Sequence, residues 1–131
     1  MTERSYAHRD VLDKLGIGPR TRVRLEGDVP EDLAERIREG ARVVHDKEGV
    51  DLVVWRIESL AEAEAGLEAA RRRIVDDGGV WILTAKRGHD DYVKQTDLIP
   101  VGKAAGLVDN KVCSVDESTS AMRFVIPRER R

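Results

Sequence analysis

The sequence has one cysteine, two tryptophans, two tyrosines and one phenylalanine, and it carries almost no net charge. Cys113 alone cannot form an internal disulfide, which is typical of a protein from a reducing compartment. The 23 Lys and Arg residues are balanced by 25 Asp and Glu residues, which gives a formal net charge of −2. Since the chain has neither excess positive charge nor many aromatic side chains to hold a nucleic acid, we expect no general nucleic-acid binding.

Long hydrophobic runs are absent as well. The longest uncharged stretch, from Gly78 to Ala85, has about eight residues, whereas crossing a bilayer takes roughly 20. Residues 1–10 carry charge and lack the apolar segment of a signal peptide. These features predict a cytoplasmic protein that does not bind membranes.

The 131 residues, of which 40% are hydrophobic, suffice for one core, because a chain of this length buries roughly two-thirds of its unfolded surface on folding. No internal repeat, low-complexity tract or long linker divides the chain. We expect a single compact domain over residues 1–131, with a short N-terminal helix at 8–15 that ends at Gly16.

Strand and helix patterns alternate over most of the chain. Val23 and Leu25 alternate with arginines, as in a strand with two different faces. Trp55 and Trp81 lie inside apolar runs that indicate central strands, and we expect both to be largely buried. The patterns predict strand 21–26, helix 30–40, strand 50–57, a helix from Ser59 to a turn at 76–79, strand 80–84, and a helix from Thr96 or Asp97 to Gly106.

Residues 42–45 are either an extended loop or a brief edge strand, because only four residues separate them from the next strand. The last two strands, 111–116 and 121–126, are joined by four residues, which permits only an antiparallel pair. The fold class is therefore α/β, with a mostly parallel sheet, a C-terminal antiparallel hairpin and helices on both faces.

Sheets of this kind bind ligands at the carboxyl ends of their strands. Seven candidate ligand-binding residues lie at the predicted strand ends: Glu26, Asp28, Arg56, Lys86, Asp116, Glu117 and Ser120. One interpretation is a polar pocket in which Asp116 or Glu117 positions Lys86 to meet an anionic group. The alternative is that these are ordinary loop charges, whose exposed pairs contribute about 0–1 kcal/mol.

The sequence predicts no metal site. His8, His45 and His89 are dispersed and do not have the spacing of metal ligands. Cys113 lies within a predicted strand, where it is expected to be a small buried side chain rather than a nucleophile. No serine occurs in a G-x-S-x-G motif.

The order of elements resembles the Rossmann-like fold of class I S-adenosylmethionine-dependent methyltransferases. Residues 50–55 resemble their fourth strand, 77–82 the glycine turn into their fifth, and 111–126 their closing hairpin. The family's G-x-G-x-G cofactor loop is replaced by Glu-Gly-Asp-Val-Pro-Glu-Asp at 26–32, and the segment of the third strand is missing. Because Val29 and Pro30 would occupy the cofactor's space beside the carboxylates of Asp28, Glu31 and Asp32, we expect no cofactor.

A closer resemblance covers nearly the whole chain. It is carried by Tyr6, by residues 8–11, 14–17 and 79–81, by Lys86, and above all by the C-terminal segment 106–125. On these residues the chain is similar to a small bacterial family known as domain of unknown function number 3052. The resemblance implies a compact methyltransferase-like domain and brings no established activity, substrate or catalytic residue. Thr119 stands where an aromatic residue is expected in that family's hairpin.

The sequence thus favours a non-catalytic binding or interaction module on a methyltransferase-like scaffold, with a small anionic ligand or a protein as its partner. The alternative is an enzyme, either an atypical methyltransferase or another activity that uses Lys86 with Asp116 or Glu117. A third hypothesis, a subunit that docks on a partner enzyme, requires an exposed apolar patch. The oligomeric state is not predicted.

Overall fold

The computed structural model describes residues 11–45 and 49–131, and its main feature is a six-stranded mixed sheet. The strand order is β2-β1-β3-β4-β6-β5. The strands are β1 (Arg22–Gly27), β2 (Arg42–Val43), β3 (Val50–Arg56), β4 (Ile74–Ala85), β5 (Val108–Ser114) and β6 (Thr119–Val125). The first four strands in chain order are parallel, whereas β6 is antiparallel to both β4 and β5. The predicted mixed sheet is confirmed.

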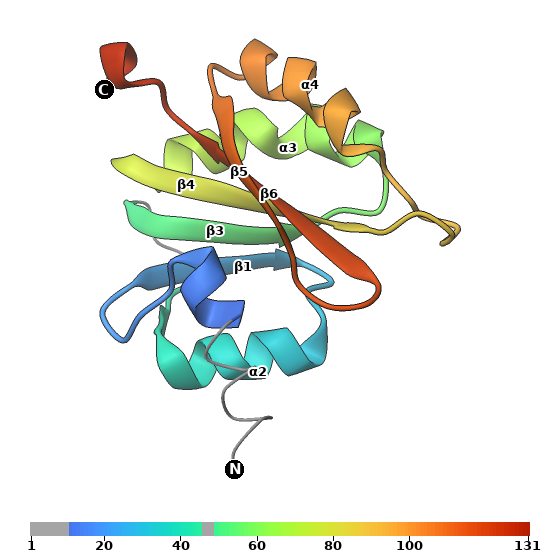
Figure 1. Ribbon diagram of the computed structural model, residues 1–131. Helices are drawn as coiled ribbons and strands as arrows, with labels where there is room; N and C mark the ends of the chain where they lie inside the picture. The colour runs from blue at the N-terminus through green and yellow to red at the C-terminus, as the bar shows by residue number, and fades with distance from the viewer. Residues whose placement is uncertain (1–10, 46–48) are drawn as a thin grey trace.

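Helices cover both faces of this sheet (Figure 1). The helices α3 (Leu60–Arg73) and α4 (Leu98–Ala104) lie on one face. The helix α2 (Glu31–Gly40) and a short helix at residues 11–15 lie on the other face. The predicted N-terminal helix is thus present from residue 11, and its first part, 8–10, lies outside the described residues.

The two faces of β1 differ as its sequence predicts. Val23 is fully buried in the α2-side core, and Leu25 packs against the same core. Arg22 lies on the opposite face, where its side chain donates to the carboxylate of Asp51 at 3.1 Å and lowers the pKa of that carboxyl group. Arg24 forms an ion pair with Glu26 on the same face. One side of β1 therefore contributes to a hydrophobic core, and the other side is covered by paired charges.

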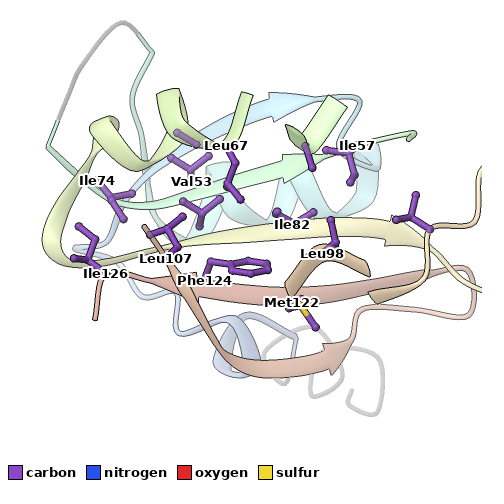
Figure 2. Close-up of a cluster of buried hydrophobic side chains, with 14 of the residues drawn as sticks. Val53, Ile57, Leu67, Ile74, Ile82, Leu98, Leu107, Met122, Phe124 and Ile126 are labelled. Carbon is purple, nitrogen blue, oxygen red and sulfur yellow. The ribbon is translucent and has the colours of Figure 1, made fainter. Parts of the chain in front are cut away.

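The core on the α3 and α4 side packs around Phe124 of β6 (Figure 2). Leu67 of α3, Leu98 of α4 and Ile82 of β4 converge on this cluster. Gly102 of α4 is required for the packing, because a Cβ atom at this position would lie 2.4 Å from the Phe124 ring. The glycine thus lets α4 approach the sheet more closely than a helix with a side chain at that position could.

Trp81 anchors the core on the α2 side. Its side chain is fully buried, and its indole nitrogen donates to the backbone oxygen of Leu15 at 2.9 Å. The hydrogen bond links the N-terminal segment to the central strand β4. Trp55, by contrast, is only partly buried and packs at the margin of the α3-side core. Burial is thus complete for Trp81, as expected from the sequence, and only partial for Trp55.

The prediction that the helix ends in a turn at residues 76–79 is wrong. The helix α3 ends at Arg73, and β4 begins at the next residue. Val50 pairs with Ile74 and Leu52 pairs with Gly79, so the residues between Ile74 and Gly79 form a large bulge within the strand. The Asp-Asp-Gly sequence therefore marks an irregularity of the strand rather than the end of the helix.

Residues 42–43 form the brief edge strand that was one of the two alternatives. This strand, β2, pairs with Arg22 and Val23 at the start of β1. On the other side of β1, the same Val23 pairs with Leu52 near the start of β3, so β2 and the start of β3 lie at the same amino-terminal edge of the sheet. This placement is the reason why so short a connection is compatible with a parallel arrangement.

We predict that Trp81→Ala lowers the free energy of unfolding by about 3–5 kcal/mol, the usual loss for a large buried aromatic side chain. Trp55→Ala is the matched control and should cost clearly less, because the side chain is partly exposed. Urea unfolding of both variants measures the difference. A loss below about 1 kcal/mol for Trp81→Ala would contradict the placement of this core.

Candidate functional site

The carboxyl ends of the parallel strands meet the β5–β6 turn at one edge of the sheet (Figure 1). Ala85, the last residue of β4, pairs with Thr119, the first residue of β6. Ser114, the last residue of β5, pairs with Ser120. The backbone N–H of Lys86 then donates to the backbone oxygen of Ser118 at 2.9 Å. These contacts fix the hairpin turn beside the loop that follows β4.

A pocket of about 440 Å³ opens at this point, and we call it the β4-end pocket. Its wall combines the end of β4, the following loop and the hairpin. It is lined by Thr84, Ala85, Lys86, Arg87, Tyr92, Val93, Gln95, Glu117 and Ser120. Three of the seven residues expected from the sequence, Lys86, Glu117 and Ser120, are thus brought together.

In the described part of the chain, the Lys86 side chain contacts no carboxylate, which corrects the contact with Asp116 or Glu117 expected from the sequence. Its amine donates to the Ser114 hydroxyl at 2.6 Å. The Asp116 carboxylate instead accepts from the backbone N–H and the hydroxyl of Ser118, at 2.8 and 3.2 Å. An aspartate in a tight turn commonly accepts a hydrogen bond from the residue two positions ahead. The Asp116 carboxylate therefore stabilises the hairpin turn and does not position Lys86.

Positive charge predominates in the β4-end pocket. Lys86 and Arg87 contribute two cations, and Glu117 contributes one carboxylate. Within residues 11–45 and 49–131, none of these three side chains forms an ion pair. The Arg87 guanidinium lies 5.9 Å from the centroid of the Tyr92 ring, a cation–π contact that leaves its charge uncompensated. The pocket therefore offers a favourable environment for an anion.

Two buried polar atoms in residues that line the pocket are unpaired. The Thr84 hydroxyl oxygen and the Gln95 amide nitrogen have no hydrogen-bond partner in the described part of the chain. An unpaired buried polar group costs about 1–3 kcal/mol. Sequence analysis identified neither these residues nor Tyr92, which reaches the pocket because it forms a bridge with Ala85. No local pattern in the sequence signals this return of the loop to the end of β4.

Arg56 connects the loop of the β4-end pocket to β3. Its guanidinium donates to the Asp91 carboxylate at 2.8 Å and to the backbone oxygen of Ile57. The hydrogen bond from Arg56 is the main cause of a lowered pKa of Asp91. Arg56 therefore does not line the β4-end pocket, but its contact with Asp91 restrains the loop that carries Tyr92.

The remaining expected residues lie apart from this pocket. Glu26 pairs with Arg24 on the open face of β1 and lies beside Trp55. Asp28 is exposed in the loop between β1 and α2. The candidate residues at the strand ends therefore do not form one group, because Glu26 and Asp28 lie outside the β4-end pocket. Thr119, at the base of the hairpin, is only 4% exposed and offers no surface for stacking.

The loop between β1 and α2 is short and closely packed. Gly27 has a φ of 72°, and a Cβ atom there would lie 2.2 Å from the Arg56 backbone oxygen. Val29 packs against the α2-side core. Glu31 and Asp32 place two carboxylates in the first turn of α2, where the helix dipole favours negative charge. An anionic ligand at this helix end would meet these carboxylates.

Other kinds of site find no support among residues 11–45 and 49–131. They contain no group of three or more His, Cys, Asp or Glu side chains arranged to hold a metal ion. Burial raises the pKa of the Cys113 thiol, which disfavours the reactive thiolate form. No helix in these segments is long and apolar enough to span a membrane.

The fold is similar to that of solved methyltransferase structures. The chain is similar to a TehB-like SAM-dependent methyltransferase from Corynebacterium glutamicum, with a TM-score of 0.58, 14% identity, and coverage of 92% of this chain and 88% of the other. A SAM-dependent methyltransferase from Aquifex aeolicus gives a TM-score of 0.59, 15% identity, and coverage of 92% and 89%. The N-methyltransferase NodS from Bradyrhizobium japonicum gives 0.58, 14%, and coverage of 95% and 97%. The protein therefore has a methyltransferase-like Rossmann fold.

The family follows from a comparison with family models. Residues 14–128 match the family described as "Protein of unknown function (DUF3052)", and the chain belongs to this family. No curated protein matches the chain. Both resemblances expected from the sequence, to this family and to the methyltransferase architecture, are confirmed.

We predict that the carboxyl group of Asp91 titrates below the ordinary aspartate pKa of about 3.9, and that Arg56→Gln raises its pKa toward that value. Because the folded-state pKa is lowered, the stability from this ion pair is present above the unfolded-state pKa and is lost as pH falls through the folded-state pKa. Carboxyl-carbon NMR titration measures the shift. Arg22→Gln is the matched control, which should raise the pKa of Asp51 and leave Asp91 unchanged.

Proposed function

We propose that this chain is a non-catalytic binding module that holds a small anionic ligand in the β4-end pocket. The observation that carries the proposal is the presence of two cations, Lys86 and Arg87, in one pocket without an ion-pair partner among the described residues. Ser120 adds a hydroxyl group to the same wall. A carboxylate or phosphate group can accept hydrogen bonds from all three side chains.

The loop between β1 and α2 stands where class I methyltransferases have their cofactor loop, and its structure favours a function other than methyl transfer. A G-x-G-x-G loop lets backbone approach the cofactor, whereas here Gly27 is pressed against β3 and Val29 is packed in the core. Beside this loop, β2 ends opposite Val23 and does not extend to the carboxyl edge of the sheet. This edge of the sheet therefore has neither a glycine-rich turn after β1 nor the end of a neighbouring strand on the β2 side of it.

The geometry around Lys86 also favours binding over catalysis. An activity using Lys86 with Asp116 or Glu117 would need proton transfer between the amine and a carboxylate within hydrogen-bond reach. The amine instead donates to Ser114, and the Asp116 carboxylate accepts from Ser118. A charged, hydrogen-bonded ammonium group suits the role of an anion anchor.

We predict that the purified protein does not bind S-adenosylmethionine at physiological concentration. Val29, Pro30 and the acidic first turn of α2 occupy the place of the glycine-rich loop. Isothermal titration calorimetry tests this directly, with S-adenosylhomocysteine as a second ligand. Saturable one-to-one binding in the micromolar range would contradict the proposal.

We predict that Lys86→Ala weakens binding of inorganic phosphate or succinate by about tenfold, the effect of one charge-assisted hydrogen bond. Its unfolding free energy should stay within about 0.5 kcal/mol of the wild-type value. The readout is chemical-shift perturbation of backbone amides in the pocket. Lys103→Ala, an exposed change on α4, is the matched control and should leave binding unchanged.

Two results would contradict the anion-binding proposal. In the first, neither probe perturbs the amides of residues 84–87 and 117–120 in the wild-type protein. In the second, Lys86→Ala and Lys103→Ala weaken binding equally, which would mean that the probes respond only to the general charge of the surface.

A further inference from the structure

A second and larger cavity lies between α3 and α4, and we call it the α3–α4 groove. Its volume is about 490 Å³, and it shares no lining residue with the β4-end pocket. Six of its nine lining residues are apolar, and the other three are acidic. The lining residues are Leu60, Glu64, Leu67, Glu68, Asp97, Pro100, Val101, Ala104 and Ala105.

The packing of α4 on the sheet explains why the groove is open. Gly102 brings α4 close to the Phe124 ring of β6, and Leu98 of the same helix is buried in the core below it. Toward α3, the helix end and the residue after it present only the small side chains of Ala104 and Ala105. These methyl groups are too short to fill the space, and an apolar depression remains on the surface.

All charged residues that line the groove are acidic. Glu64 and Glu68 lie on the α3 side, and Asp97 lies just before α4. In the described part of the chain, none of the three carboxylates is in an ion pair or accepts a hydrogen bond from a side chain. Arg71 and Arg72 follow Glu68 at helical spacing, where such pairs commonly form, yet they do not pair with it. The carboxylates are thus available to cations from outside.

We propose that the α3–α4 groove is the docking site for a cationic amphipathic helix of a partner protein. The groove extends along α3 from Leu60 to Glu68, which corresponds to about 12 Å or two helical turns. A partner helix would place apolar side chains, spaced three and four residues apart, against Leu60, Val101 and Ala104. Lysine or arginine residues on its flanks would meet Glu64, Glu68 and Asp97.

This proposal is independent of the anion-binding function. The two surfaces share no lining residue, and a cationic helix needs the acidic groove whereas a small anion needs the cationic pocket. The proposal also assigns a chemistry to the partner. A partner with an acidic or purely apolar helix would lack complementarity to the groove.

The test uses a two-heptad peptide of repeated Leu-Lys-Lys-Leu-Leu-Lys-Leu sequence, and its counterpart in which glutamate replaces lysine. The wild-type protein should bind the lysine peptide, measured by fluorescence anisotropy and by amide shifts confined to α3 and α4, and should bind the glutamate peptide at least tenfold more weakly. The double variant Glu64→Lys and Glu68→Lys should weaken binding of the lysine peptide at least tenfold. The matched control is Glu35→Lys with Glu39→Lys, which changes two exposed carboxylates of α2 by the same charge.

Ala104→Gln tests the apolar part of the groove without changing the charge. Ala104 is exposed on α4, so the variant should fold normally while its longer side chain fills the groove and weakens the peptide at least fivefold. The proposal would be overturned if the α2 and α3 charge reversals weakened binding of the lysine peptide equally. It would also be overturned if the peptide shifted amides outside α3 and α4, or if it bound Ala104→Gln as tightly as the wild-type protein. Lys86→Ala should leave peptide binding unchanged, which separates this result from the outcome of the anion experiment.

Discussion

The structure depends on β4 being buried on both faces and paired along both edges. This strand pairs in parallel with β3 from Gly79 to Leu83, and it pairs antiparallel with β6 from Gly79 to Ala85. Trp81 and Leu83 enter the α2-side core, whereas Val80 and Ile82 enter the α3-side core. Because no polar side chain could be placed on most of this strand without a large desolvation cost, the apolar composition of β4 fixes the centre of the molecule.

The same strand positions the candidate site. Where β4 ends at Ala85, the hairpin is held alongside by the Ala85–Thr119 pair and by the hydrogen bond from Lys86 to Ser118. The following loop is restrained from the other side by the ion pair between Arg56 and Asp91. The cations of the β4-end pocket therefore stand on a framework with defined backbone contacts, a condition that favours precise recognition of a small ligand.

A methyltransferase-like fold supports several surfaces that do not depend on the cofactor. The sheet, the hairpin and the helices α3 and α4 form the framework, and neither the β4-end pocket nor the α3–α4 groove is lined by a residue of β1, β2 or the loop into α2. A fold alone does not fix an activity, because function depends on the residues at a site. The residues of this chain supply a cationic pocket at the end of β4 and an acidic, apolar groove between two helices.

Several elements could be predicted from local sequence because local physics determines them. The alternation of Val23 and Leu25 with arginines indicated the two faces of β1. The helix expected from Ser59 begins there because the Ser59 hydroxyl accepts a hydrogen bond from the Glu62 backbone N–H. The four residues between the last strands required an antiparallel hairpin. The turn predicted at Asp76–Gly79 was wrong because these residues suit either a turn or a bulge. Pairing with β3 selects the bulge.

By itself, the sequence determined the order of the elements, the mixed sheet and the grouping of Lys86, Glu117 and Ser120 at one edge, since these follow from periodicity, turn length and strand direction. Only the tertiary structure decided which atoms meet. It paired Lys86 with Ser114 because Asp116 already bonds within its own turn, and it placed Tyr92 and Gln95 beside β4. It also left the α3–α4 groove open, because the distance between two helices depends on side chains from three elements distant in the sequence.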